Sequence, residues 1–120
     1  MSRGETPRAA IVTVRCLSDH SLFGMRMEQT AHGGWVATWA FSIPPERAHR
    51  EGYTETRLEG SFDVAEGYPG CPGCANRAFA KCNACSGLGC SSGQGYWTCP
   101  HCGLGGPLSG SITSLSSHAD

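Results

Sequence analysis

Cysteines are the residues of this 120-residue chain whose type and spacing could carry out chemistry. There are eight of them, in three CxxC pairs and two single positions: Cys71 and Cys74, Cys82 and Cys85, Cys99 and Cys102, Cys90, and Cys16. Two residues between cysteines let one tight turn direct both sulfur atoms at one tetrahedral ion, with Zn–S distances of about 2.3 Å. The segment from Cys71 to Cys102 therefore predicts at least one structural zinc ion, with iron as the less favoured metal.

A predicted hairpin suggests how the pairs combine. Residues 76–81 and 88–92 can form two strands with the tip at residues 83–87, and this hairpin would return the chain to its start. Four thiolates would then meet at the open end of the hairpin, in the arrangement of a zinc ribbon. They are those of Cys71, Cys74, Cys99 and Cys102.

The remaining cysteines, Cys82, Cys85 and Cys90, would lie near the other end of the hairpin. Three sulfur atoms leave a second ion one ligand short of a closed tetrahedral site. Cys16 is the candidate for the fourth ligand, but its place on the apolar face of a predicted strand fits an ordinary buried thiol equally well. The sequence thus predicts one or two zinc ions.

The elements that must position these cysteines are mainly β-strands. Apolar and polar side chains alternate with a period of two in residues 10–16, 23–28, 35–43 and 57–64, which is typical of half-buried strands. In the third strand five apolar residues would share one face and supply the largest part of the core: Trp35, Ala37, Trp39, Phe41 and Ile43. The prediction is a small β-rich fold with a four-stranded antiparallel sheet, followed by a zinc-ribbon-like cysteine lobe.

A short helix and three boundaries complete this organisation. Pro45 suits the first turn of a helix and Gly52 suits its end. Composition then divides the chain into an antiparallel β lobe (residues 9–66), a metal-binding lobe (67–108) and a Ser-rich tail predicted to be disordered (109–120), with residues 1–8 flexible. A lobe of roughly 40 residues buries too little apolar surface to fold alone, so metal ligation would supply its folding free energy.

Charge and hydropathy exclude several partners and compartments. The net charge of -1 offers no basic excess for a phosphate backbone, so no nucleic acid is expected. No stretch approaches the roughly 20 apolar residues needed to cross a bilayer, so no membrane association is expected. Residues 1–8 do not resemble a secretory signal, which favours the cytoplasm, where paired thiols bind metal rather than form disulfides.

Catalysis is not expected either, because a site closed by four thiolates keeps no open coordination position for substrate or water. No acid/base pair suggests itself among the scattered carboxylates. Two other functions fit paired cysteines. One is a rubredoxin-like electron carrier with iron at four thiolates, and the other is a nucleic-acid-binding zinc ribbon, although the cysteine lobe carries only Arg77 and Lys81 as cations.

Several short motifs occur together along most of the chain, from about Ile11 to Gly106. They are Cys16, Trp39-Ala40-Phe41, Arg50-Glu51-Gly52-Tyr53, Gly60-Ser61-Phe62, and Tyr68-Pro69-Gly70-Cys71-Pro72 onward to Cys99-Pro100-His101-Cys102-Gly103. In this combination the chain resembles the TerY C-terminal metal-binding domain. The resemblance implies that all eight cysteines chelate metal, in two sites of four thiolates.

The same resemblance implies a role and partners. The domain usually accompanies a von Willebrand factor A domain in bacterial tellurium-resistance and stress-response systems, beside a protein kinase and a PP2C-type phosphatase. This chain lacks the DxSxS metal-adhesion motif of that attached domain and is too short to contain it. It is therefore expected to be a free-standing module or one excised from a longer protein, and the initiating Met1 favours the former. Its predicted function is that of a non-catalytic zinc-binding component that contacts protein partners.

Overall fold

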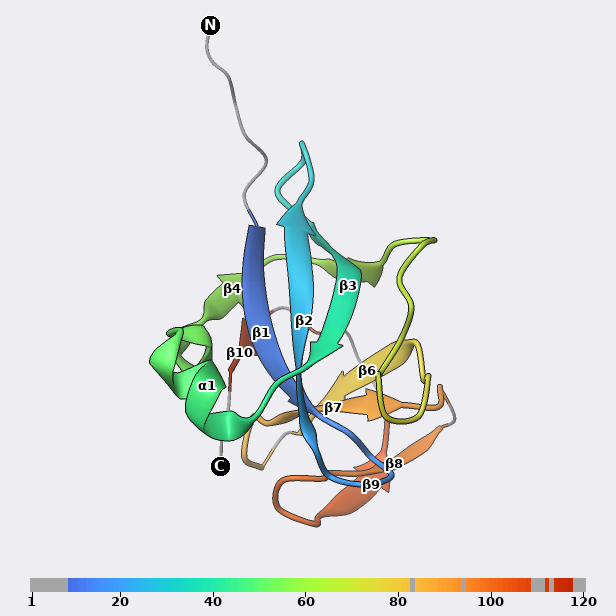
Figure 1. The fold of residues 1–120 in the computed structure, drawn as a ribbon. Helices are drawn as coiled ribbons and strands as arrows, with labels where there is room; N and C mark the ends of the chain where they lie inside the picture. The colour runs from blue at the N-terminus through green and yellow to red at the C-terminus, as the bar shows by residue number, and fades with distance from the viewer. Residues whose placement is uncertain (1–8, 83, 94, 109–111, 113, 118–120) are drawn as a thin grey trace, which may run out of the picture.

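The main sheet has six strands in the computed structural model, which describes residues 9–82, 84–93, 95–108, 112 and 114–117. Its strands, in spatial order, are β5 (Phe62–Val64), β3 (Trp35–Ser42), β2 (Leu22–Gln29), β1 (Ala9–Arg15), β7 (Leu88–Ser91) and β6 (Ala78–Lys81). The sheet is strongly twisted, and β6 and β7 lie at the lower ends of β1 to β3 in Figure 1.

Smaller elements surround this sheet. Two further sheets of two strands pair β4 (Arg57–Glu59) with β10 (Ser114–Ser116) and β8 (Tyr96–Thr98) with β9 (Gly105–Pro107). The short helix α1 (Pro45–Arg50) is confirmed, with Pro45 in its first turn and Gly52 at φ 82° before the 3₁₀ turn η1 (Tyr53–Glu55). Within the described residues, no helix has the length and apolar character needed to cross a membrane.

The predicted four-stranded antiparallel sheet is wrong in strand number and in pairing. The pairs β1–β2, β2–β3 and β6–β7 are antiparallel, whereas β5 lies parallel to β3 and β7 lies parallel to β1. The β1–β7 contact, at Arg15 and Gly89, links the two predicted lobes in one sheet. Long-range pairing of this kind leaves no local signature, because each strand shows only its own alternation.

One predicted strand, residues 57–64, is divided in two. Gly60 has a φ of 133°, a value that side chains other than that of glycine rarely adopt, and the chain bends there. As a result β4 leaves the main sheet to pair with β10, while β5 continues beside β3. The alternation of apolar residues continues through the bend, so periodicity alone could not show it.

The segment predicted to be a disordered tail contains β10. Ser114, Leu115 and Ser116 pair with β4, and the side chain of Leu115 is fully buried in the main core. The structure therefore differs from that prediction at residues 114–116. The composition of the segment is polar, but Leu115 enters the core, and Lys81 and the N–H of Thr13 donate hydrogen bonds to Ser114 and Ser117.

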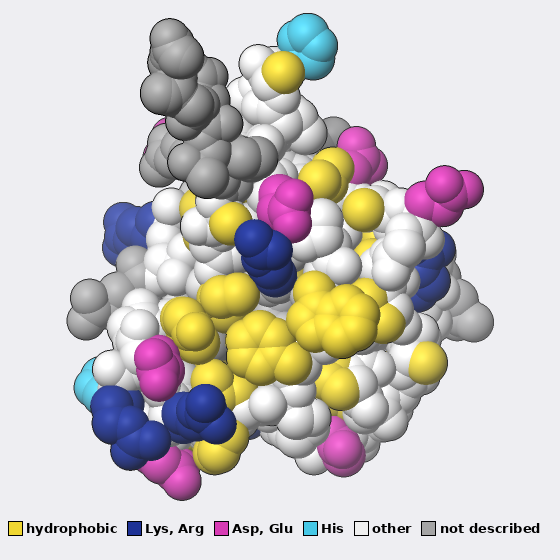
Figure 2. Space-filling view, turned by 45° about the horizontal axis from the view of Figure 1, so that its top comes forward, with side chains coloured by type: hydrophobic (Ala, Val, Ile, Leu, Met, Phe, Trp, Pro, Cys, Tyr) yellow, Lys and Arg dark blue, Asp and Glu magenta, His cyan; other side chains and the backbone are white. Residues whose placement is uncertain are grey.

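A β-bulge changes the predicted face of β3. Arg26 of β2 pairs with Trp39 and Met27 pairs with Ala37, which leaves Thr38 as an extra residue on β3. The alternation is thereby inverted after Ala37. Trp35 is buried, as predicted, but Trp39 is 55% exposed on the opposite face of the sheet. Figure 2 shows hydrophobic side chains gathered over β1 to β3 on this outer face.

Candidate metal centre

The eight cysteines form two groups of four, which we call site A and site B. Site A consists of Cys16, Cys71, Cys74 and Cys90, and site B of Cys82, Cys85, Cys99 and Cys102. Within each group all four sulfur atoms lie within 4.8 Å of one another, and each group could hold a metal ion.

The spacing of the sulfur atoms fits a tetrahedral ion. The distance is 3.4 Å between Cys74 and Cys90, 3.6 Å between Cys82 and Cys102, and 3.7 Å between Cys85 and Cys99. A tetrahedron with Zn–S distances of about 2.3 Å has edges of about 3.8 Å. A disulfide would place the sulfur atoms about 2.05 Å apart. The two groups therefore have the dimensions of metal sites, and all eight cysteines are free thiols.

The ligand pairing favoured by the sequence is wrong. Cys71 and Cys74 do not meet Cys99 and Cys102, although the predicted hairpin does form as β6 and β7. After β7 the chain turns at Gly93, which has a φ of 84°, and β8 runs back beside the hairpin. The turn that carries Cys99 and Cys102 thereby lies at the tip of the hairpin, beside Cys82 and Cys85, rather than at its open end. The glycines at positions 93 and 95 were a sequence signal for this reversal.

Packing between β7 and β8 fixes this reversal. The indole nitrogen of Trp97 donates a hydrogen bond of 3.0 Å to the carbonyl oxygen of Cys90. A Cβ atom on Gly89 would lie 2.6 Å from Pro100 and 2.8 Å from Trp97, so only glycine permits this approach. The close contact holds the Cys99 turn against the Cys82 turn.

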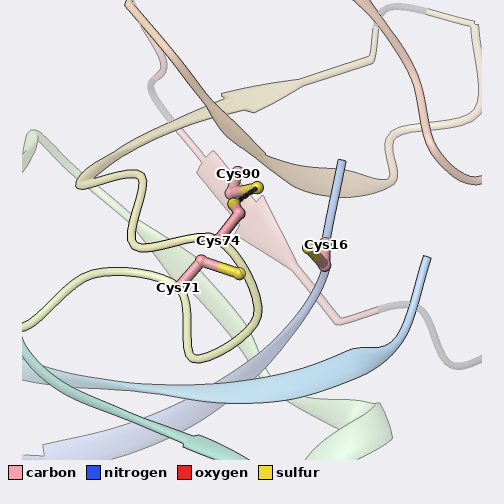
Figure 3. A group of neighbouring side chains, drawn as sticks. All are labelled: Cys16, Cys71, Cys74 and Cys90. Atoms are coloured by element: carbon pink, nitrogen blue, oxygen red, sulfur yellow. Dashed lines mark hydrogen bonds between the residues drawn. The ribbon is translucent and has the colours of Figure 1, made fainter. Parts of the chain in front are cut away.

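Site A is assembled by the main sheet. Cys16 follows β1 directly, Cys90 lies within β7, and the pairing of these two strands brings both sulfur atoms to the same edge of the core. Figure 3 shows their side chains directed toward those of Cys71 and Cys74, which come from the loop before β6. Cys16, which the sequence left undecided between ligand and buried thiol, lies in a group of four sulfur atoms.

Turns with a common hydrogen-bond pattern carry seven of the eight sulfur atoms. In each turn the N–H of the first cysteine donates to the carbonyl five residues later, and the N–H four residues later donates back to the carbonyl of that cysteine, at 2.7 to 2.9 Å. The residue four positions after the cysteine has a positive φ in every case. These turns begin at Cys16, Cys71, Cys82 and Cys99.

Backbone N–H groups in these turns point at the sulfur atoms. The N–H groups of Gly73, Ala84 and His101 lie 3.3 to 3.4 Å from the sulfur of the cysteine that begins their turn. Likewise, the N–H of Leu17 donates to Cys90 at 3.1 Å. Such donors stabilise thiolates and so reduce the cost of gathering four negative sulfur atoms.

Without metal, the thiols differ in acidity. Desolvation raises the pKa of Cys85 to about 12 and that of Cys90 to about 11. Burial also acts to raise the pKa of Cys82, but hydrogen bonds from the N–H groups of Cys85 and Ala84 outweigh it and lower the pKa to about 7. Because a metal binds the thiolate, it must displace protons from Cys85 and Cys90 at neutral pH.

The two sites differ in their exposure to solvent. Three sulfur ligands of site A are buried within the main core cluster, beside Val14 and Leu88. Site B packs against Trp97 in a smaller cluster, and its Cys102 is exposed. His101 belongs to neither sulfur group, and its Nε2 atom lies 2.9 Å from the carbonyl oxygen of Leu88.

Comparison of the chain with protein-family models, curated proteins and solved structures gives no match. The resemblance to the TerY C-terminal domain therefore stays a prediction. The structure itself shows the placement of the cysteines: each of the eight lies in one of two groups of four that could hold a metal ion.

Proposed function

We propose that the chain is a non-catalytic module in which each sulfur group holds one structural zinc ion. The observation that supports this proposal is that the thiols form two separate groups of four, with sulfur atoms spaced like the ligands of one tetrahedral ion. Borderline-soft Zn²⁺ suits four thiolates, and a site closed by four protein ligands has no open position for catalysis. Both metals would therefore stabilise the fold.

Each metal would tie together segments that lie apart in the sequence. At site A the ligands come from the end of β1, the loop before β6, and β7, so the ion would join the N-terminal strands to the cysteine-rich region. At site B they come from two turns, each between a pair of short strands. Structural zinc contributes on the order of 10 kcal/mol, comparable with the whole stability of a small domain.

The outer face of the main sheet suits a protein partner. Trp39 is 55% exposed, and Phe41 is half-buried beside it with its ring 6.4 Å from that of Tyr53. Hydrophobic side chains form a continuous area there in Figure 2. Arg26 and Glu28 on the same face form an ion pair at 2.9 Å, so these two charges offset each other. Exposed aromatic residues of this kind are typical of protein interfaces.

The resemblance to the TerY C-terminal domain supplies the proposed setting. In that setting the module acts in the bacterial cytoplasm, as a protein-interaction component of a tellurium-resistance and stress-response phosphorylation system. Its partners would be a von Willebrand factor A protein, a protein kinase and a PP2C-type phosphatase. The balanced charge of the chain, -1 overall, supports protein rather than nucleic acid as the partner.

A rubredoxin-like iron site is the second candidate, and site B is the place for it. Two turn-borne CxxC pairs face each other there, and the exposed Cys102 would bring an electron to the protein surface. Iron at four thiolates absorbs visible light, whereas zinc does not. An absorption spectrum of the purified protein therefore distinguishes the two functions.

The first experiment is elemental mass spectrometry of protein purified without added metal, together with its absorption spectrum. Two zinc ions per chain and no visible absorption are expected. Cys71→Ser and Cys99→Ser should each remove one equivalent, and the double variant should remove both. If the two cysteines shared one site, the double variant would lose only one equivalent. A wild-type chain without bound metal would contradict the proposed function.

A further inference from the structure

One of the four turns lacks its second cysteine. In the turns that begin at Cys71, Cys82 and Cys99 the residue three positions later is also a cysteine, and both sulfur atoms enter the same site. The turn that begins at Cys16 has the same two backbone hydrogen bonds, at 2.8 and 2.9 Å, and the same positive φ at its fifth residue, His20. In this turn the position of the second cysteine is occupied by Asp19.

The carboxylate of Asp19 makes the same contact as the missing sulfur. In the Cys82 turn, the N–H of Gly87 donates to the sulfur of Cys85 at 3.3 Å. At the equivalent place, the N–H of Ser21 donates to Oδ1 of Asp19 at 2.9 Å, and the hydroxyl of Ser21 adds a bond of 2.7 Å. An anionic oxygen thus stands where the other turns present a thiolate.

The carboxylate also faces site A. A Cβ atom placed on Gly73, between Cys71 and Cys74, would lie 3.0 Å from the sulfur of Cys16 and 3.3 and 3.5 Å from the two carboxylate oxygens of Asp19. Asp19 and Cys16 therefore lie against the same side of the Cys71 turn. Asp19 is exposed, whereas Cys90, the fourth sulfur ligand of the site, is 1% exposed within β7.

We infer that Asp19 is an alternative ligand of site A, able to take the place of Cys90, although its oxygens are not among the atoms that lie within 4.8 Å of one another there. This inference rests on the proposed metal occupancy of site A. Carboxylate oxygen is an accepted zinc ligand, at a metal–oxygen distance of about 2.0–2.2 Å. Asp19 offers its oxygen from the solvent side, while Cys90 offers its sulfur from inside the sheet.

Cobalt(II) binding to the full chain tests this inference, because cobalt reports its ligands through its visible and near-ultraviolet spectrum. Cys90→Ser should still bind two cobalt ions, with a weaker sulfur-to-metal charge-transfer band as one thiolate is replaced by oxygen. Adding Asp19→Asn should lower the affinity of site A by roughly 100-fold or more, because loss of an outer group that only supports a ligand already costs about 10- to 100-fold. Asparagine keeps the oxygen that accepts from Ser21, so the turn is preserved.

The matched control is Asp63→Asn, which removes a carboxylate on β5 that is also exposed. Cys90→Ser with Asp63→Asn should behave like Cys90→Ser alone. If Cys90→Ser binds only one cobalt ion, or if Asp19→Asn has no further effect, the inference is overturned. A wild-type chain that binds fewer than two cobalt ions would contradict the proposed function instead.

A second variant tests position 19 directly, with circular dichroism as the check on folding. Asp19→Cys combined with Cys90→Ser completes the fourth CxxC turn and should restore the four-thiolate cobalt spectrum. Failure to restore it in a chain whose circular dichroism matches the wild type would show that position 19 does not reach the metal.

Discussion

Leu115→Ala tests the most unexpected packing contact of the fold. Leu115 is fully buried in the main core cluster although it lies in a Ser-rich segment near the C-terminus. The substitution removes three carbon atoms, and at about 0.8 kcal/mol each their transfer from water accounts for about 2.4 kcal/mol. The cavity left behind brings the expected loss of stability to about 3–5 kcal/mol, within the range for buried leucines.

The assay is urea unfolding of the metal-loaded protein at a fixed concentration of free zinc, because metal binding contributes to the measured stability. Leu104→Ala is the matched control, since Leu104 is 58% exposed and its truncation should change the stability by less than about 0.5 kcal/mol. In thermal unfolding the Leu115 variant should melt on the order of 10 °C lower than the control. Equal midpoints for the two variants would refute the docking of β10.

Three further predictions concern the sheet and the metals. Trp35→Ala should lower the free energy of unfolding by about 3–5 kcal/mol because Trp35 is buried, whereas Trp39→Ser should change it by less than about 1 kcal/mol. Equal losses for the two variants in urea denaturation would contradict the bulge. Gly24→Ala should lower the free energy of unfolding by about 1–3 kcal/mol, because the new Cβ would lie 2.6 Å from the ring of Phe41. Gly67→Ala is its control and should leave the free energy of unfolding nearly unchanged, because no atom lies within 4 Å of the new Cβ. Removing the metals with EDTA should abolish slow amide exchange around both sites, and protection that persists would show that they are not structural.

Local signals predicted much of the secondary structure. Period-two alternation located β1, β2 and β3, and the β6–β7 hairpin was inferred from the spacing of the cysteine pairs. Pro45 and Gly52 located the helix between them. Each of these signals resides in the residues that form the element, so a single sequence is sufficient to read it.

Other features depend on contacts that no local pattern encodes. The inverted face of Trp39 results from one extra residue on β3, and alternation before and after a bulge looks the same as alternation without one. The burial of Leu115 depends on a partner strand more than 50 residues earlier. A polar segment with one leucine is compositionally indistinguishable from a disordered one.

The candidate site was predicted in composition but not in pairing. The CxxC spacing identified the ligands of the turns because that spacing is itself a geometric requirement. Which turns meet depends on the reversal at Gly93, and the role of Cys16 depends on the pairing of β1 with β7. The common backbone pattern of the four turns became visible only with coordinates, because Asp19 interrupts the CxxC signature in the first of them.

The pairing of β1 with β7 has a consequence for the synthesis of the chain. β1 is synthesised before β7, its second neighbour in the sheet, which is complete only at Ser91. Until then the Arg15 end of β1 has no strand on the side that β7 takes, and an open strand edge is the kind that recruits other chains into aggregates. A ribosome that stalls before Cys90 would thus leave a nascent chain with an open sheet and one ligand of site A missing.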